Sequence, residues 1–243
     1  VYGENNEDTP ELLLNISSYL LKRGEEELAL RLMRYLVECS RRRAGEGSPQ
    51  HREIVTSIAL ALDTKYPQFR YDICAAENEK FVPEPNYEYT DEDSDFYWAL
   101  GLAAVSLEKN EEAYEAFDKS YGIRQKLLGE DNGFTQLACR ERAVLAIMLG
   151  KNIKESVDKL RIFLEKLQNG KFSEIMDGKL ALIYEAKTLY VILRFAVEGE
   201  ECRECKPYLD RYGELCDVFG KDSGEVCINR RFYFNALGLY WMT

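Results

Sequence analysis

The stretch YWALGLAAVSLEKNEEAYEAFDKSYGIRQKLLGED, residues 97–131, decides the fold. Its apolar residues recur at the three- to four-residue spacing of a helix over residues 94–107 and again over residues 111–127. Only the short turn EKN separates these two segments, and LGEDNG ends the second one. Helices joined by so short a turn run antiparallel, so the stretch predicts a helical hairpin.

The same pattern runs through most of the chain. In residues 10–23, Leu13, Ile16, Leu20 and Leu21 form one apolar stripe of a helix. No segment alternates apolar and polar residues in the way that a half-buried strand does. We expect further helices over residues 25–43, from 49 onward, and over 134–149, 153–167, 179–197, 202–219 and 225–243. The sequence therefore predicts an all-α protein built of antiparallel helix hairpins.

Glycine-containing breaks divide these helices into pairs. RRRAGEG at Gly45, QKLLGED at Gly129 and CDVFGKD at Gly220 each follow a long second helix and precede the first helix of a new pair. Their separations are multiples of about 42 to 45 residues, a period typical of two-helix repeats. In such arrays each repeat buries its apolar face against its neighbours, so we expect an α-solenoid.

Residues 97–121 resemble a tetratricopeptide repeat. Tyr97, Leu100 and Gly101 in the first helix, and Ala113 and Phe117 in the second, stand at the offsets of that family. The small residues at 101 and 113 have a mechanical reason, because the two helices of a hairpin cross closely there. The resemblance implies a right-handed superhelix whose first helices line a concave groove.

The next residues are similar to the longer repeat, of roughly 42 residues, found in kinesin light chain. The residues that match its closing motif are Ile123, Arg124, Lys126, Leu128, Gly129 and Asp131, whereas Asn132–Gly133 stands where that repeat has His-Pro. On this basis we expect three parts: N-terminal hairpins over residues 1–81, an acidic linker over 82–93, and tetratricopeptide-like repeats over 94–243 that end in an unpaired helix. Within residues 64–95 we expect a short or irregular helix before the linker.

Composition limits the possible partners. The net charge of -11 argues against binding of nucleic acid or of an anionic membrane surface. No apolar run reaches the ~18 residues of a membrane span. Seven cysteines without framework spacing suit a reducing compartment, so we expect a cytoplasmic protein. The missing initiator Met and the final helix without a partner suggest a segment of a larger polypeptide.

Few motifs indicate chemistry. The loop GEDNG, residues 129–133, lacks the ligand spacing of an EF-hand and the pattern of a phosphate-binding loop, so we interpret it as a helix end and a helix cap. Cys202 and Cys205 form a CxxC pair, but Cys216 and Cys227 follow at irregular spacing, and we expect small buried side chains and no metal. His51, the one histidine, has no partner evident in the sequence, and we expect it at the surface or at a cap. We expect no cofactor, no catalytic residue and no enzyme.

The resemblance places candidate partner-binding residues on the first helices of the repeats. In the repeats of clear register these are Glu11, Asn15, Ser18, Leu21, Asp95, Trp98, Leu102 and Val105. In the degenerate repeats they are Gln136, Arg140, Tyr190, Arg194, Asn229, Tyr233 and Asn235. Asn and Arg side chains can hold a peptide backbone or carboxylate, and aromatic side chains can anchor a partner.

The expected function is a non-enzymatic scaffold or regulatory module that binds a protein or peptide along this groove. The alternative is a peptide-sensing domain that controls a DNA-binding or catalytic domain outside this segment. Two further stretches stay open. The arginines at 41–43 are either a basic patch or the complement of a helix dipole, and NYEYTDEDSD, residues 86–95, is either a docking segment with tyrosine anchors or a solvated linker.

Overall fold

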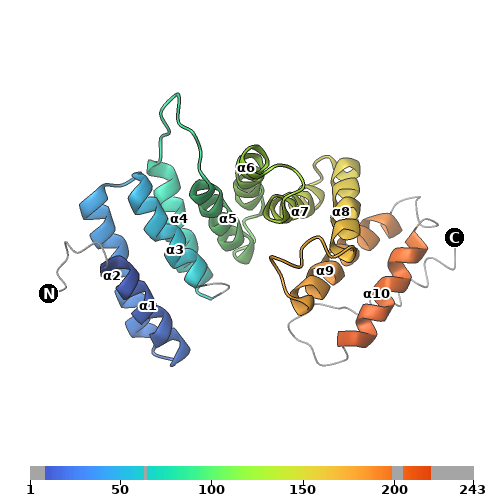
Figure 1. Ribbon diagram of the computed structural model, residues 1–243, viewed down its shortest axis with the longest axis horizontal. Coiled ribbons are helices and arrows are strands. Elements are labelled where there is room, and N and C mark those ends of the chain that lie inside the picture. Colours follow the sequence, from blue (N-terminus) through green and yellow to red (C-terminus); the bar gives the residue numbers. More distant parts are fainter. Residues whose placement is uncertain (1–8, 63–64, 199–204, 220–243) are drawn as a thin grey trace. The chain divides into compact units, whose positions relative to one another are not determined.

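The computed structural model describes residues 9–62, 65–198 and 205–219, which are helical except for short turns and two longer loops, residues 81–90 and 169–177. Within them there is no strand. The helices, labelled in Figure 1, are α1 (Thr9–Lys22), α2 (Glu26–Ala44), α3 (Pro49–Ala61), α4 (Pro67–Lys80), α5 (Asp91–Ser106), α6 (Asn110–Leu128), α7 (Gly133–Met148), α8 (Ile153–Gln168), α9 (Gly178–Glu198) and α10 (Lys206–Phe219). The all-α prediction is confirmed for the part of the chain described. The helix expected over 225–243 lies outside it.

The chain divides into two compact units, an N-terminal unit, Val1–Glu130, and a C-terminal unit, Asp131–Thr243. In the N-terminal unit each helix from α1 to α6 packs against the next, and α3 also packs against α5. In the C-terminal unit α7 packs against α8, α8 against α9, and α9 against α10. Packing in sequence order is the architecture of an α-solenoid, in which each hairpin contacts its neighbours. The handedness of a superhelix stays a prediction.

Each unit has its own core. The N-terminal unit has two clusters of buried apolar side chains. One contains Met33, Leu36 and Ile58. The other joins α3, α4, α5 and α6 around Phe96 and Tyr97. In the C-terminal unit α7, α8, α9 and α10 share a single cluster of apolar side chains. Because a continuous core of the N-terminal unit crosses the expected linker, the division of the chain differs from the one expected at residues 82–93.

The hairpin α5–α6 shows why small residues stand at the predicted crossing. A Cβ atom on Gly101 would lie 2.8 Å from ring atoms of Phe117, and Ala113 is fully buried. A larger side chain at either position would push the two helices apart. The close crossing that the sequence predicts is confirmed.

The segment 64–95 differs from the prediction. Residues 67–80 form the regular helix α4, with Pro67 in its first turn. The loop covers only residues 81–90, and Asp91, Glu92 and Asp93 form the acidic first turn of α5. Thr90 caps that helix by accepting a hydrogen bond from the backbone N–H of Asp93, whose carboxylate in turn accepts one from Thr90 N–H. Asp91, Glu92 and Asp93, which the sequence assigns to a linker, therefore begin α5. Their negative charges interact favourably with the positive N-terminal end of the helix dipole.

The loop GEDNG, residues 129–133, ends α6 and begins α7. Gly129 ends α6 with a φ of 85°, a conformation that favours glycine, and its N–H donates to Gln125 O. Asn132 begins α7 by accepting hydrogen bonds from the N–H groups of Phe134 and Thr135. The predicted roles, a helix end and a cap, are confirmed.

Candidate functional site

A groove with a volume of about 680 Å³ lies among the first three helices of the N-terminal unit, and we call it the α1–α3 groove. The residues that line it are Pro10, Glu11, Leu13, Leu14, Tyr35, Leu36, Cys39, Ser40, Arg43, Ala44, Gln50, Glu53, Ile54 and Ser57. Most of them are apolar, and the charged ones are few and of both signs. A concave apolar surface with a few polar groups is the usual form of a binding site.

The floor of the α1–α3 groove comes from the apolar stripes of its helices. Leu13 and Leu14 of α1 and Ile54 of α3 are half-buried against the core around Leu36. Tyr35 of α2 lies beside them and keeps 42% of its surface exposed. A tyrosine ring next to an apolar floor offers a large rigid contact surface to a bound segment.

The turn between α2 and α3 follows the groove residue Ala44 and precedes the groove residue Gln50. Gly47 has a φ of 74°, and a Cβ atom there would lie 2.7 Å from the carbonyl oxygen of Lys80, so only glycine fits. Ser48 then caps α3 by accepting a hydrogen bond from the N–H of His51, with Pro49 in the first turn. This cap and proline are the ones predicted from the sequence.

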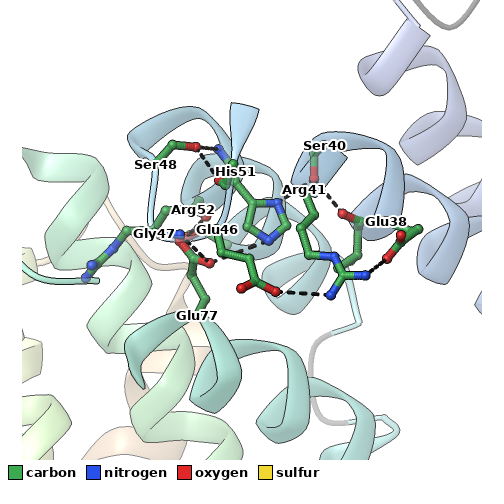
Figure 2. Close-up of polar contacts among 12 residues, drawn as sticks. Glu38, Ser40, Arg41, Glu46, Gly47, Ser48, His51, Arg52 and Glu77 are labelled. Carbon is green, nitrogen blue, oxygen red and sulfur yellow. Dashed lines mark hydrogen bonds and ion pairs between the residues drawn. The ribbon is translucent and has the colours of Figure 1, made fainter. Parts of the chain in front are cut away.

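His51 lies in a buried polar network, not at the surface as expected (Figure 2). Its Nδ1 is 2.7 Å from Ser40 Oγ of α2, and its Nε2 is 3.5 Å from Glu77 Oε2 of α4. The same carboxylate oxygen accepts a hydrogen bond from Gly47 N–H at 3.3 Å. Only 4% of His51 and 2% of Glu77 are exposed. The network joins α2, α3 and α4, and its Ser40 also lines the α1–α3 groove.

The hydrogen bonds of Ser40 determine where the protons of this network lie. The Ser40 hydroxyl donates to the carbonyl oxygen of Val37 at 2.9 Å, so His51 Nδ1–H is the donor to Ser40 Oγ. The neutral ring then presents an unprotonated Nε2 to Glu77. That contact is favourable when one proton lies between the two groups, on either His51 or Glu77.

Burial shifts the pKa of both groups. Desolvation lowers the pKa of His51 below its ordinary value of 6.5, partly opposed by the charge of Glu46. Desolvation also raises the pKa of Glu77 above its ordinary value, against the opposing effects of the Gly47 N–H and the Arg52 charge. Both shifts favour a neutral histidine and a protonated glutamic acid.

Ser40, His51 and Glu77 share residue types with a hydrolytic triad, but their geometry favours a structural role. A nucleophilic serine needs backbone N–H donors around the developing oxyanion. Ser40 instead lies near the C-terminal end of α2, where carbonyl groups point outward and the helix dipole is negative. The Ser40 hydroxyl donates its hydrogen bond to the carbonyl oxygen of Val37 and not to His51.

Arg52 lies next in the chain and is buried in an unusual environment. Its guanidinium lies 3.9 Å from the ring centroids of both Phe81 and Phe96, and its Nε is 3.4 Å from Asp93 Oδ1. Its three nitrogens make no hydrogen bond within the described residues. The charge is compensated by aromatic faces and one carboxylate. No pattern around position 52 predicts this role, because arginine side chains on a helix are usually exposed.

The predicted groove residues of the N-terminal unit have different surroundings. Asn15 is exposed and Ser18 half-buried on α1, and neither lines the α1–α3 groove, whereas Glu11 does. Trp98 is half-buried, with its ring 5.1 Å from that of Phe117 and 5.2 Å from the Arg124 guanidinium. Its indole therefore packs within its own hairpin.

In the C-terminal unit, the described candidate residues Arg140, Tyr190 and Arg194 lie on α7 and α9. Arg140 is buried, and its guanidinium donates to Thr188 Oγ1 of α9 and to Glu141. Tyr190 is half-buried against the core, and Arg194 is exposed one turn further along α9. Asn229, Tyr233 and Asn235 lie outside the described residues. Arg140 thus joins α7 to α9 and is not presented to solvent as a groove residue would be.

The remaining motifs have local explanations. Arg41 and Arg42, in the last turn of α2, form ion pairs with Glu38, and Arg41 also pairs with Glu46. These contacts and the position at a helix end favour the dipole interpretation. Cys205 and Cys216 are buried in the core of the C-terminal unit, and Cys202 and Cys227 lie outside the described residues.

In the part of the chain that the structure covers, no group of three or more His, Cys, Asp or Glu residues is placed to hold a metal ion. Among the same helices, none combines the length and the apolar character needed to cross a membrane. No protein-family model matches the chain, and no curated protein matches it.

Proposed function

We propose that the chain is a non-enzymatic module of the tetratricopeptide kind that binds a segment of another protein, or a peptide, in the α1–α3 groove. The observation that carries the proposal is the groove itself, with its apolar floor, its exposed Tyr35 and charged residues of both signs among its lining. Helical arrays commonly bind partners through such surfaces, because stacked helices leave grooves between them.

The occupant that fits is a segment with at least one large apolar side chain. That side chain would cover the floor at Leu14 and Ile54 and contact the ring of Tyr35, while Glu11, Arg43 and Glu53 would contact polar groups around it. The structural role of Ser40 and His51 supports binding without catalysis, since the Ser40–His51 hydrogen bond joins α2 to α3 and His51 also contacts Glu77 of α4.

A peptide selection tests this proposal. Peptides displayed on phage are selected against the whole chain, and their affinities are measured by calorimetry for the wild type, Tyr35→Ala and Tyr19→Ala. Tyr19 is a matched control, because it is also an exposed tyrosine of the first hairpin but does not line the groove. We expect Tyr35→Ala to weaken binding about tenfold, the loss of one aromatic anchor, and Tyr19→Ala to leave it unchanged. Selected peptides that bind Tyr35→Ala as tightly as the wild type would contradict the proposal.

A further inference from the structure

A second groove lies in the N-terminal unit, between the loop 81–90 and the C-terminal half of α6. It has a volume of about 480 Å³, and we call it the Tyr–Lys groove. Tyr87, Tyr89 and Tyr97 line it on the side of the loop and α5, and Lys119 and Lys126 line it on α6. It shares no lining residue with the α1–α3 groove.

The tyrosine side of this groove is held in place by the protein itself. The rings of Phe81 and Tyr87 meet edge to face at 5.3 Å, and those of Tyr87 and Tyr89 at 5.2 Å. The Tyr87 hydroxyl donates to the buried carboxylate of Asp93 at 2.8 Å, which ties the loop to the start of α5. A preformed wall reduces the entropy that binding would otherwise cost.

The α6 side contains a gap where a side chain could stand. Gly122 lies in the middle of α6, and a Cβ atom placed on it would have no neighbour within 4 Å. Glycine inside a helix costs roughly 1 kcal/mol relative to alanine, and here no close packing requires it. Ile123 and Leu127 flank the gap, and 49% of Leu127 is exposed. The surface of α6 is therefore open at Gly122, beside the apolar side chains of Ile123 and Leu127.

The charges around this opening indicate the partner. Lys119 and Lys126 stand on either side of Gly122, one turn away from it along the same face of α6. Lys119 lies over the ring of Tyr97 at 4.9 Å. Glu88 is the only acidic residue in the lining, so the groove carries a local positive charge on a chain whose net charge is -11. Such local complementarity selects acidic partners.

We propose that the Tyr–Lys groove binds an acidic peptide segment that carries a large apolar or aromatic side chain. The apolar side chain fills the opening above Gly122, between Leu127 and the tyrosine rings. Carboxylates on both sides of it pair with Lys119 and Lys126. This site goes beyond the function proposed for the α1–α3 groove, because it is a different surface with a different chemistry.

Three blocked pentapeptides test the proposal by NMR titration of the whole 15N-labelled chain. The first has phenylalanine between two pairs of aspartates, the second has alanine in place of the phenylalanine, and the third has lysines in place of the aspartates. We expect the first to shift the amide signals of Gly122, Ile123 and Lys126 saturably, and the other two to bind at least about tenfold more weakly, since each lacks one of the two interactions. Equal binding of all three would overturn the proposal.

Two variants and one control locate the site. Lys126→Glu should weaken binding of the first peptide about fivefold, the effect of one exposed charge, and Lys187→Glu, an exposed lysine of α9, should not change it. Gly122→Leu should abolish binding without lowering the unfolding temperature, because its side chain occupies the groove and not the core. Binding that survives Gly122→Leu overturns the proposal. Shifts confined to the signals around Tyr35 would also overturn it, and they would place the peptide in the α1–α3 groove.

Discussion

At the scale of single residues, burial of His51 in a polar network lowers the pKa of its imidazole. The folded protein holds a proton on His51 less tightly than the unfolded chain does, because burial lowers its pKa. The contribution of His51 to stability is therefore complete above its ordinary pKa of 6.5 and is lost as the pH falls through the lowered pKa. Glu77 acts in the opposite sense, because its pKa is raised, so its contribution is lost as the pH rises.

NMR can measure this titration without assignment problems, since His51 is the one histidine of the chain. We expect its imidazole signals to titrate below pH 6.5 in the folded protein and at about 6.5 in urea, where the ring is solvated. The free energy of unfolding should also fall more steeply with acid below pH 6.5 in the wild type than in His51→Gln. A folded midpoint at or above 6.5 would show that the charge of Glu77 outweighs burial.

At the scale of the helix, the two glycines inside the hairpin α5–α6 have opposite physical reasons. Gly101 is required by packing, because a Cβ atom would lie 2.8 Å from the ring of Phe117. Gly122 is not required by packing, because nothing lies within 4 Å of its added Cβ. We expect Gly101→Ala to lower the free energy of unfolding by about 1–3 kcal/mol and Gly122→Ala to raise it by about 1 kcal/mol.

Urea denaturation of the two variants beside the wild type measures both changes. Both variants replace glycine by alanine inside a helix of the same hairpin, so the gain in intrinsic helix propensity is the same for both. The difference between the two free energies of unfolding therefore reports the surroundings of each site. If Gly122→Ala destabilised the protein, the opening above α6 would be closed in solution, and the Tyr–Lys groove would lose its basis.

The same scale shows what could be predicted from the sequence. Helix positions followed from apolar spacing, and caps at Ser48 and Asn132 followed from residue types whose side chains bond the next backbone N–H groups. These interactions are local, so a pattern within a few residues determines them. Within residues 64–95 the sequence predicts only a short or irregular helix, because Pro67 and the charged residues beside it resemble a break. The helix α4 is regular there, since a proline is well tolerated in a first turn.

The polar contacts that hold the hairpins together could not be predicted in this way. Glu77 meets Gly47 across 30 residues, and Arg140 meets Thr188 across 48. Which polar residue of a helix turns inward depends on the register between hairpins, and a family pattern gives that register only approximately. Arg140 lies on α7 and Trp98 on α5, and the side chains of both pack within their own units, so their role in partner binding stays a prediction.

At the scale of the whole molecule, the question is where the chain divides. The acidic composition of residues 82–93 suggested a linker, yet α4 and α5 pack together on either side of it. Val55 of α3 and Cys74 of α4 are buried against Phe96 of α5, and Arg52 pairs with Asp93. Cutting there would expose an apolar cluster and leave a buried arginine without its carboxylate, which is costly. The boundary between Glu130 and Asp131 separates two units that each keep their own core.

Thermal unfolding of two fragments, residues 1–130 and residues 1–85, tests which of the two boundaries separates independently folded units. We expect fragment 1–130 to be helical and to unfold in one cooperative thermal transition by circular dichroism, because its cores around Met33 and Phe96 are complete. Fragment 1–85 lacks α5, so the cluster around Phe96 cannot form, and we expect it to lose helix content gradually on heating. Each hairpin of a solenoid depends on its neighbour for burial, so removing α5 and α6 should also weaken α3 and α4. A transition of fragment 1–85 as cooperative and as high in temperature as that of fragment 1–130 would instead place the boundary at the acidic segment, as the sequence alone suggested.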